Sequence, residues 1–156
     1  MFLPTMQLLA DGKRWEGERL KVYLDSLGNA TQGIGRHHGV NVGDPDIDVI
    51  TEARWFGEDI NMAYAGARKL FPDLDTYDSV RRDAIIWLVF NMGEDKLAQF
   101  VPFAKYVNAR QWSEAAYHLL TNTSAHLTPY LMQTGVRAVE TALRIATGEV
   151  LAEFRA

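Results

Sequence analysis

Apolar residues recur every three or four positions over most of this chain, which is the spacing of one face of an α-helix. The longest such stretch is 51–71. The most apolar stretch is 79–92, where the run AIIWLVF predicts burial on most sides. The pattern predicts helices over the following ranges: 4–14, 51–71, 79–92, 101–110, 111–122 and 129–148.

Residues that suit helix ends stand at several of these boundaries. Thr5, Thr51 and either Asp78 or Ser79 precede apolar periodic runs. Their side-chain oxygens can accept a hydrogen bond from the first turn of a helix, so we expect them to be N-caps. Gly93 follows the most apolar run and suits a helix C-terminus, because glycine tolerates a left-handed backbone.

One stretch near the N-terminus changes its period from three or four to two. Apolar side chains alternate over 20–24, which predicts a strand, and 30–35 predicts a returning strand. Gly28 and Asn29 lie between the two runs, and both tolerate a positive φ, so we expect a tight turn there. The polar stretch 37–48 is expected to be loop or a short third strand.

The predicted elements give an α+β fold in which the strands are segregated from most of the helices. We expect one domain over 1–156 with two lobes. The N-terminal lobe, about 16–60, holds the small sheet, and the helical lobe comprises about 72–156 and the helix 4–14. The long helix joins them, and a cleft between two such lobes is a natural ligand site.

Composition excludes several classes of protein. The chain has no cysteine, so it has neither disulfides nor thiolate metal sites. Its net charge is −4 and it lacks a polybasic patch, so we do not expect a nucleic-acid partner. No apolar run reaches the ~18 residues that would span a membrane. The N-terminus does not resemble a secretory signal, so we expect the protein to be kept in a cytoplasm.

Three residues around the predicted hairpin suit the hydrolysis of a glycosidic bond. Glu16 ends the first helix, Asp25 ends the first strand, and Thr31 starts the second. That reaction needs a proton donor for the leaving oxygen and a second carboxylate that activates water or stabilises the oxocarbenium-like transition state. A hydroxyl such as that of Thr31 can position the water. Spacing alone nevertheless favours ordinary capping and solvated acids, because both are common at such positions.

The stretch WEGERLKVYLDSLGNATQGIGR closely resembles the signature of the phage-type lysozymes, the muramidases of glycoside hydrolase family 24. The signature has the form E-G-x-R-L-x-x-Y-x-D-x-x-G-x-x-T-x-G-I-G-H. The matching residues are Glu16, Gly17, Arg19, Leu20, Tyr23, Asp25, Gly28, Thr31, Gly33, Ile34 and Gly35. The segments YDSVRRDAIIWLVFNMGEDKLAQF, QWSEAA and TGVRAVETALRIATGE resemble the family's helical lobe.

The resemblance implies hydrolysis of the β-1,4 bond between N-acetylmuramic acid and N-acetylglucosamine in peptidoglycan. It maps the general acid to Glu16, the base or electrostatic partner to Asp25, and the hydroxyl that positions water to Thr31. Carboxylates ~6.5–9.5 Å apart would predict inversion. The resemblance implies no cofactor and no metal. It also implies a role in bacterial host lysis, with the enzyme held in the host cytoplasm until it is released to the wall.

Further residues are expected to bind the glycan strand. Gly35 matches a glycine on the cleft wall, where a side chain would crowd a sugar. Phe90 matches an aromatic residue on the opposite wall, and Arg137 matches an arginine that pairs near the catalytic glutamate. We add Asn91, next to Phe90, to this group.

Histidines complete the set of candidate sugar contacts. His37 lies just past Gly35, and His118 lies on a predicted helix that could face the cleft. His37 and His38 are adjacent, so in an extended chain they face opposite sides and are poorly placed to share a metal.

The chain departs from the signature at Arg36, where the family's usual residue is histidine. The His–Asp ion pair found in some members is therefore absent or is replaced by one that uses Arg36. Two other functions stay open: a lytic transglycosylase, and a non-catalytic wall-binding or tail module. Because Glu16, Asp25 and Thr31 are all present, hydrolysis by a monomeric enzyme acting on peptidoglycan glycan strands is favoured.

Overall fold

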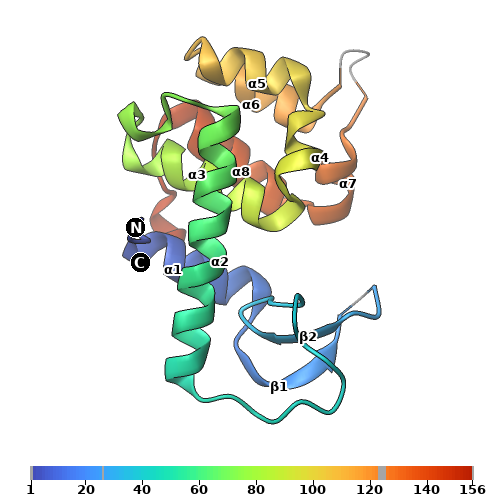
Figure 1. Cartoon of the computed structure of the whole chain (residues 1–156). Coiled ribbons are helices and arrows are strands. Elements are labelled where there is room, and N and C mark those ends of the chain that lie inside the picture. The colour runs from blue at the N-terminus through green and yellow to red at the C-terminus, as the bar shows by residue number, and fades with distance from the viewer. Residues whose placement is uncertain (1, 26, 123–125, 156) are drawn as a thin grey trace. The chain divides into compact units, whose positions relative to one another are not determined.

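A computed structural model describes residues 2–25, 27–122 and 126–155. These residues contain eight α-helices and one antiparallel pair of strands, which confirms the predicted α+β class (Figure 1). The elements are α1 (Met6–Glu16), β1 (Arg19–Leu24), β2 (Ala30–Gly33), α2 (Val49–Leu70), α3 (Ser79–Met92), α4 (Glu94–Ala98), α5 (Val101–Asn108), α6 (Trp112–Leu120), α7 (Pro129–Thr134) and α8 (Val136–Thr147). Two short 3-10 helices, Leu74–Thr76 and Ala152–Phe154, complete them.

The chain divides into two compact units, which we call the hairpin unit (2–62) and the helical unit (63–155). Helix α2 begins in the first and ends in the second. Helix α1 groups with the hairpin unit, whereas from the sequence we expected it to group with the helical lobe.

Helix α1 begins where its cap was predicted. The Thr5 hydroxyl accepts a hydrogen bond from the Leu8 N–H at 3.0 Å, and the Leu8 side chain is buried. Gly12 allows this helix to lie close to α2, because a Cβ at Gly12 would be 2.6 Å from the Phe56 ring. Phe56 and Ile34 are buried beside it, so α1, the hairpin and the start of α2 share one small core.

The hairpin pairs β1 with β2 in the register Tyr23↔Thr31 and Leu24↔Ala30. Gly28 has a φ of 84° as the turn requires, but Asn29 does not use the positive φ that it could tolerate. Leu24 is 61% exposed, so the predicted apolar alternation does not bury every member. Ser26, which also belongs to the predicted turn, lies outside the described residues.

No third strand follows the hairpin within the described residues. A buried glutamine, Gln32, instead holds the loop: its side-chain amide donates to the carbonyls of Leu20 at 2.7 Å and Pro45 at 2.9 Å. Buried polar groups need such partners, and here one side chain satisfies two backbone carbonyls. The loop is thereby fixed against the strand without a ladder of its own.

Helix α2 begins two residues before the predicted position, and its cap is Asp48 rather than Thr51. The Asp48 carboxylate accepts a hydrogen bond from the Thr51 N–H at 2.7 Å. Hydrogen bonds from Thr51 also hold the pKa of Asp48 below its usual value. Thr51 therefore lies inside the first turn, where its N–H is the capped group.

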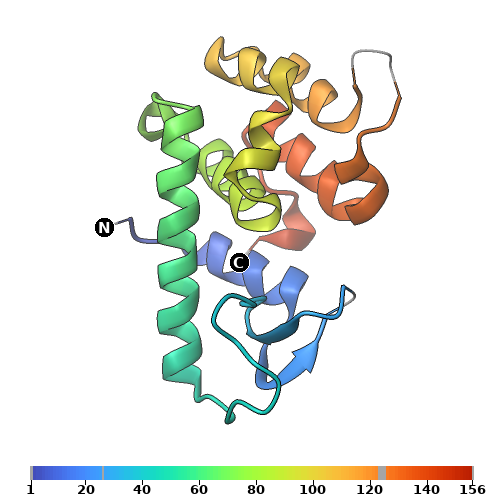
Figure 2. The ribbon, with the colours of Figure 1, turned by 45° about the vertical axis from the view of Figure 1, so that its right-hand side comes forward.

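The helical unit is built around α3, whose residues 83–89 are all buried. Helix α8 contacts α3, α6 and α7 within this unit, and α5 lies beside α6 (Figures 1 and 2). Asp78 caps α3 as predicted, accepting from the Arg81 N–H at 3.0 Å, and Gly93 ends it with a φ of 86°. None of the described helices is both long and apolar enough to span a membrane.

Two features of the helical unit differ from the prediction. The expected helix 129–148 is two helices, because Gly135 takes a φ of 54° and a ψ of −117° between α7 and α8. Helix α4, Glu94–Ala98, was not predicted; it is a single short turn that follows Gly93. Both departures are local changes of direction at glycine, which side-chain periodicity does not report.

Candidate active site

Glu16, the predicted acid, is the last residue of α1 and lies against the backbone of Gly35. A Cβ at Gly35 would be 3.1 Å from the Glu16 Cγ and 3.2 Å from its Oε2. Gly35 has a φ of 73°, which side-chain-bearing residues rarely adopt. Gly35 therefore supports the catalytic candidate itself, a role that the resemblance did not imply.

Asp25, the second predicted carboxylate, is held by three hydrogen bonds from the hairpin turn. Its Oδ1 accepts from the N–H groups of Leu27 at 2.9 Å and Asn29 at 2.8 Å, and its Oδ2 accepts from the Asn29 side-chain amide at 3.0 Å. The bonds from Asn29 are the main cause that holds the pKa of Asp25 below its usual value; the Leu27 bond and the charge of His37 act in the same direction. Asp25 is thus an anion with a fixed orientation.

Thr31 is buried opposite Tyr23 in the hairpin. Its hydroxyl lies 3.1 Å from the carbonyl oxygen of Asn29. A carbonyl can only accept, so the hydroxyl proton of Thr31 points to Asn29. The Thr31 hydroxyl oxygen can therefore only accept a hydrogen bond from a further group such as a water.

Tyr23 connects the two carboxylates electrostatically, and sequence reasoning did not single it out. Burial is the main cause that raises its pKa, the Arg19 charge opposes that, and Glu16 and Asp25 each raise it further. The Arg19 guanidinium lies 4.3 Å from the centre of the Tyr23 ring. The signal was available, because Tyr23 is one of the matched signature positions, but its residue type alone did not indicate chemistry.

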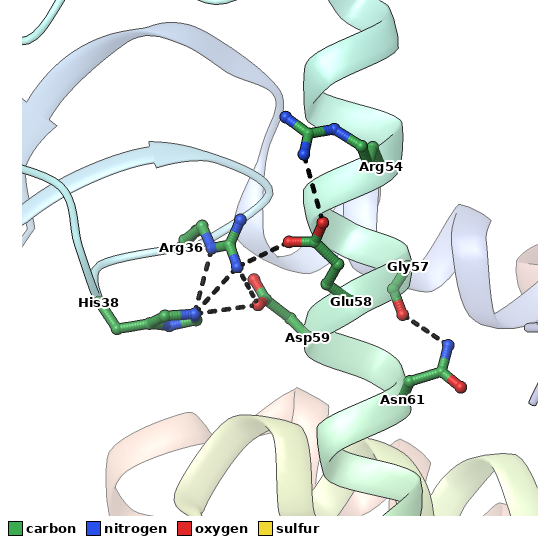
Figure 3. Close-up of polar contacts among 7 residues, drawn as sticks. All are labelled: Arg36, His38, Arg54, Gly57, Glu58, Asp59 and Asn61. Atoms are coloured by element: carbon green, nitrogen blue, oxygen red, sulfur yellow. Dashed lines mark hydrogen bonds and ion pairs between the residues drawn. The ribbon is translucent and has the colours of Figure 1, made fainter. Parts of the chain in front are cut away.

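Arg36, which stands where the signature has histidine, forms an ion pair with Asp59, and His38 joins it. Figure 3 shows both side chains directed at Asp59 of α2: Arg36 Nη2 lies 3.1 Å and His38 Nε2 lies 3.2 Å from its Oδ1. Arg36 also reaches Glu58 at 3.1 Å. The Asp59 side chain is 6% exposed, so this pair is largely shielded from water.

His37 and His38 follow β2 outside any strand, and their rings form an edge-to-face pair. Their rings are nearly perpendicular, with centroids 6.2 Å apart. His38 lies against Asp59, and the charge of His37 acts to lower the pKa of both Asp25 and Asp59. Within the described residues, no three histidine or acidic side chains are grouped as a metal site would require.

The structure places the other predicted sugar contacts in the helical unit. Phe90 and Asn91 end α3, and the Phe90 ring stacks on Trp87 with centroids 5.1 Å apart. His118 of α6 stacks on Tyr106 at 5.1 Å, and its Nδ1 is buried without a hydrogen-bond partner among the described residues. Arg137 lies in the first turn of α8. Their contacts with sugar, and the predicted cleft, stay predictions.

A helix that ends in glutamate and a hairpin that carries aspartate and threonine, on a mostly helical fold, are the arrangement expected of a glycoside hydrolase of the lysozyme class. Comparison with known proteins gives the family. The chain matches the phage lysozyme family over residues 13–132, and it belongs to that family. This family comprises peptidoglycan hydrolases, so the protein is a glycoside hydrolase whose substrate is peptidoglycan.

Two similar proteins come from Dictyostelium discoideum. "Probable T4-type lysozyme 1" is 28% identical over 152 residues, an alignment that covers 81% of this chain and 89% of the relative. "Probable T4-type lysozyme 2" is 26% identical over 151 residues, with the same coverage. Both alignments extend over most of each protein, so the likeness is not confined to the hairpin.

Proposed function

We propose that this protein hydrolyses the β-1,4 bond between N-acetylmuramic acid and N-acetylglucosamine with Glu16, Asp25 and Thr31. One observation carries the proposal: the hairpin carries an ionised carboxylate, Asp25, and a hydroxyl, Thr31, whose proton is already donated to the Asn29 carbonyl, so that it offers only lone pairs to a water. A water that meets an anion and such a hydroxyl can donate both of its protons and direct its own lone pair at carbon.

In the proposed reaction Glu16 gives its proton to the glycosidic oxygen, and the bond from that oxygen to the anomeric carbon of N-acetylmuramic acid breaks. The oxygen of the water held by Thr31 bonds to the same carbon. The proton that this water loses goes to Asp25. The products are two shorter strands, one with a new reducing end, and attack from the face opposite the leaving oxygen inverts the anomeric configuration.

The hydrogen bonds on Asp25 favour one of the two roles considered for it. Three donors stabilise the anion and so make Asp25 a weak base. We therefore assign it first to stabilising the positive charge of the oxocarbenium-like transition state. Proton transfer from water to Asp25 follows once the attacking oxygen has itself become acidic.

Removal of the acid tests the proposal. Glu16→Gln should abolish clearing of purified peptidoglycan while the far-UV circular dichroism spectrum and melting temperature stay close to those of the parent protein. Asp25→Asn should also lose most activity. Glu114→Gln, an exposed carboxyl in the first turn of α6, is the matched control and should keep full activity. Substantial clearing by the Glu16→Gln variant would disprove the assignment.

Mass analysis of the released fragments separates hydrolysis from lytic transglycosylation. Hydrolysis adds one water per cleaved bond and leaves a reducing N-acetylmuramic acid. Internal attack by a sugar hydroxyl would give the 1,6-anhydro sugar, which is lighter by one water. Proton NMR of the first product formed would further show the α anomer if the reaction inverts. An anhydro product would refute the hydrolase, and the complete absence of cleavage would favour a binding module.

We also propose that the enzyme acts in bacterial host lysis, waiting in the host cytoplasm until the membrane opens. The family supports this role, because its phage members attack the wall of the host. Expression in a bacterium should leave the culture turbid until chloroform or a hole-forming phage protein is added. Lysis without either addition would contradict the proposed confinement. The protein should also elute as a monomer of 17.6 kDa in light scattering.

A further inference from the structure

Asn29 makes four hydrogen bonds to the two residues on either side of the hairpin turn. Its N–H and its side-chain amide donate to the Asp25 carboxylate at 2.8 and 3.0 Å. Its carbonyl accepts from the Asp25 N–H at 3.0 Å and from the Thr31 hydroxyl at 3.1 Å. No other described residue contacts both members of the proposed water site in this way.

We infer that Asn29 is a positioning residue, which orients the Asp25 carboxylate and the Thr31 hydroxyl together as one water-binding unit. The inference rests on the proposed function, and it adds a residue that neither the family signature nor the spacing of acids indicates. The position is unspecified in the signature, so the resemblance assigns it no role.

The side chain of Asn29 makes a hydrogen bond to Asp25 that the backbone cannot make. The Oδ1 of Asp25 is held by backbone N–H groups, which any residue at position 29 would offer. The Oδ2 accepts from the Asn29 amide. Donors on both oxygens restrict torsion about the Cβ–Cγ bond of Asp25 more strongly than donors on Oδ1 alone. The amide therefore decides which lone pairs of Asp25 face the site of the water.

Two substitutions separate this role from that of an ordinary turn asparagine. Asn29→Ala removes the amide donor and leaves every backbone bond in place. Asn29→Asp keeps the size and shape but replaces the donor with a second carboxylate facing Asp25. Asn41→Ala is the control, since Asn41 is an exposed asparagine in the loop of the same unit.

The first measurement follows the Asp25 carboxyl carbon by NMR as pH is varied, and it does not depend on activity. In the parent protein Asp25 should titrate below the ordinary aspartate value of about 3.9. Asn29→Ala should raise that midpoint because a donor to the anion is lost. Asn29→Asp should raise it more because a like charge is added. Asn41→Ala should leave it unchanged.

The second measurement is the pH profile of peptidoglycan hydrolysis. The acidic limb of this profile should move to higher pH in Asn29→Ala and to still higher pH in Asn29→Asp, in parallel with the NMR midpoints. kcat should fall roughly tenfold to a hundredfold at the optimum with KM little changed, because misplacement of a reacting group affects the transition state. If Asn29 only stabilises the turn, the substitutions should instead lower the melting temperature and leave the acidic limb at the same pH as in the parent protein.

The two measurements fail in different ways. If Asp25 titrates at the ordinary aspartate value in the parent protein, or if neither substitution changes its midpoint, the positioning role is disproved whatever the activity of the variants. If the midpoints shift as expected but Glu16→Gln and Asp25→Asn stay active, Asn29 orients Asp25 and the proposed catalytic assignment is what fails. Should Asn29→Ala not fold, the near-isosteric Asn29→Asp and the parent titration still decide the question.

Discussion

Gly35 lies directly against the side chain of Glu16. A Cβ at Gly35 would be 3.1 Å from the Glu16 Cγ, 3.3 Å from its Cβ and 3.2 Å from its Oε2. From the family resemblance we expected a side chain at position 35 to crowd a sugar. In this structure it would first displace the carboxyl that we propose as the acid, so the glycine sets the position of a reacting group.

Gly35→Ala should reduce activity much more than stability. The added methyl group pushes Glu16 by a few tenths of an ångström or more, and a misplacement of about 1 Å in a reacting group can cost about a hundredfold in rate. The strained φ of 73° costs roughly 1–2 kcal/mol of unfolding free energy. Peptidoglycan clearing at a fixed enzyme concentration and thermal melting would measure the two effects.

Gly39→Ala is the matched control for this prediction. Gly39 also has a φ of 73°, but a Cβ there would meet no atom within 4 Å. The two variants therefore share the backbone strain, and only Gly35→Ala meets Glu16. If both lose activity equally, strain in the loop is the cause and the contact with Glu16 is unimportant.

The helices and the hairpin could be predicted from the sequence because local signals determine them. Thr5 and Asp78 cap helices at the predicted positions, and Gly93 ends α3. The prediction of Thr51 as the N-cap of α2 was wrong because two good capping residues stand near the start of this helix. Asp48 is the one whose carboxylate reaches the free N–H group. Hydrophobic periodicity locates a helix well and its first residue poorly.

The candidate site could be predicted in part. The spacing of Glu16, Asp25 and Thr31 identified a possible hydrolase, and the surrounding signature made it specific. Asn29 was missed as a site residue, because an asparagine in a turn has an ordinary explanation and its bonds to Asp25 and Thr31 depend on the folded turn. Periodicity could not reveal that Asp59 is the partner of Arg36, since tertiary packing brings them together.

Arg36→Ala should destabilise the hairpin unit, because it leaves the buried Asp59 carboxylate without its guanidinium. Removal of one partner from a shielded ion pair costs about 3 kcal/mol of unfolding free energy. Urea unfolding at neutral pH would measure it. Arg54→Ala is the control: Arg54 also reaches Glu58, at 3.4 Å, but it is largely exposed, so its loss should cost less than about 1 kcal/mol.

The loss in Arg36→Ala should also depend on pH. Burial raises the pKa of Asp59, and Arg36 and His38 oppose that rise. Without Arg36 the pKa rises further, so the folded state favours protonated Asp59, and stability is lost as pH increases through the folded pKa. The gap between parent and variant should therefore narrow in acid. A gap that is constant from neutral to acidic pH would show that the lost interaction is packing of the arginine stem.

The start of α2 provides a paired test of its cap. Asp48→Ala should lower the melting temperature by about 2–4 °C, because the Thr51 N–H loses its acceptor. Thr51→Ala keeps that hydrogen bond and should have a smaller effect. The Asp48 contribution is present above the unfolded pKa of the carboxyl and is lost as pH falls through the lowered folded value. A larger decrease in melting temperature for Thr51→Ala than for Asp48→Ala would show that Thr51 is the cap.

Glu52 should make the hairpin unit less stable at neutral pH than in mild acid. It lies in the first turn of α2, 2% exposed, and burial, followed by the adjacent Glu18, raises its pKa from 4.5 to about 7. A raised folded pKa means that stability is fully present below the unfolded value of 4.5 and is lost as pH increases through about 7. Glu18 stays ionised beside it, because its hydrogen bond with Lys13 lowers the pKa of Glu18.

Glu52→Gln should therefore stabilise the protein above pH 7. The amide has the shape of the protonated carboxyl and can still donate to Glu18, and it carries no charge that must be buried. At about 1.36 kcal/mol per unit of pKa, the shift from 4.5 to about 7 makes the gain at pH 8 on the order of 3 kcal/mol, or several degrees in melting temperature. Below pH 5 parent and variant should melt together, while Glu114→Gln should match the parent at both pH values. If Glu52→Gln melts at the same temperature as the parent at pH 8, the Glu52 carboxyl is ionised without cost and its burial does not limit stability.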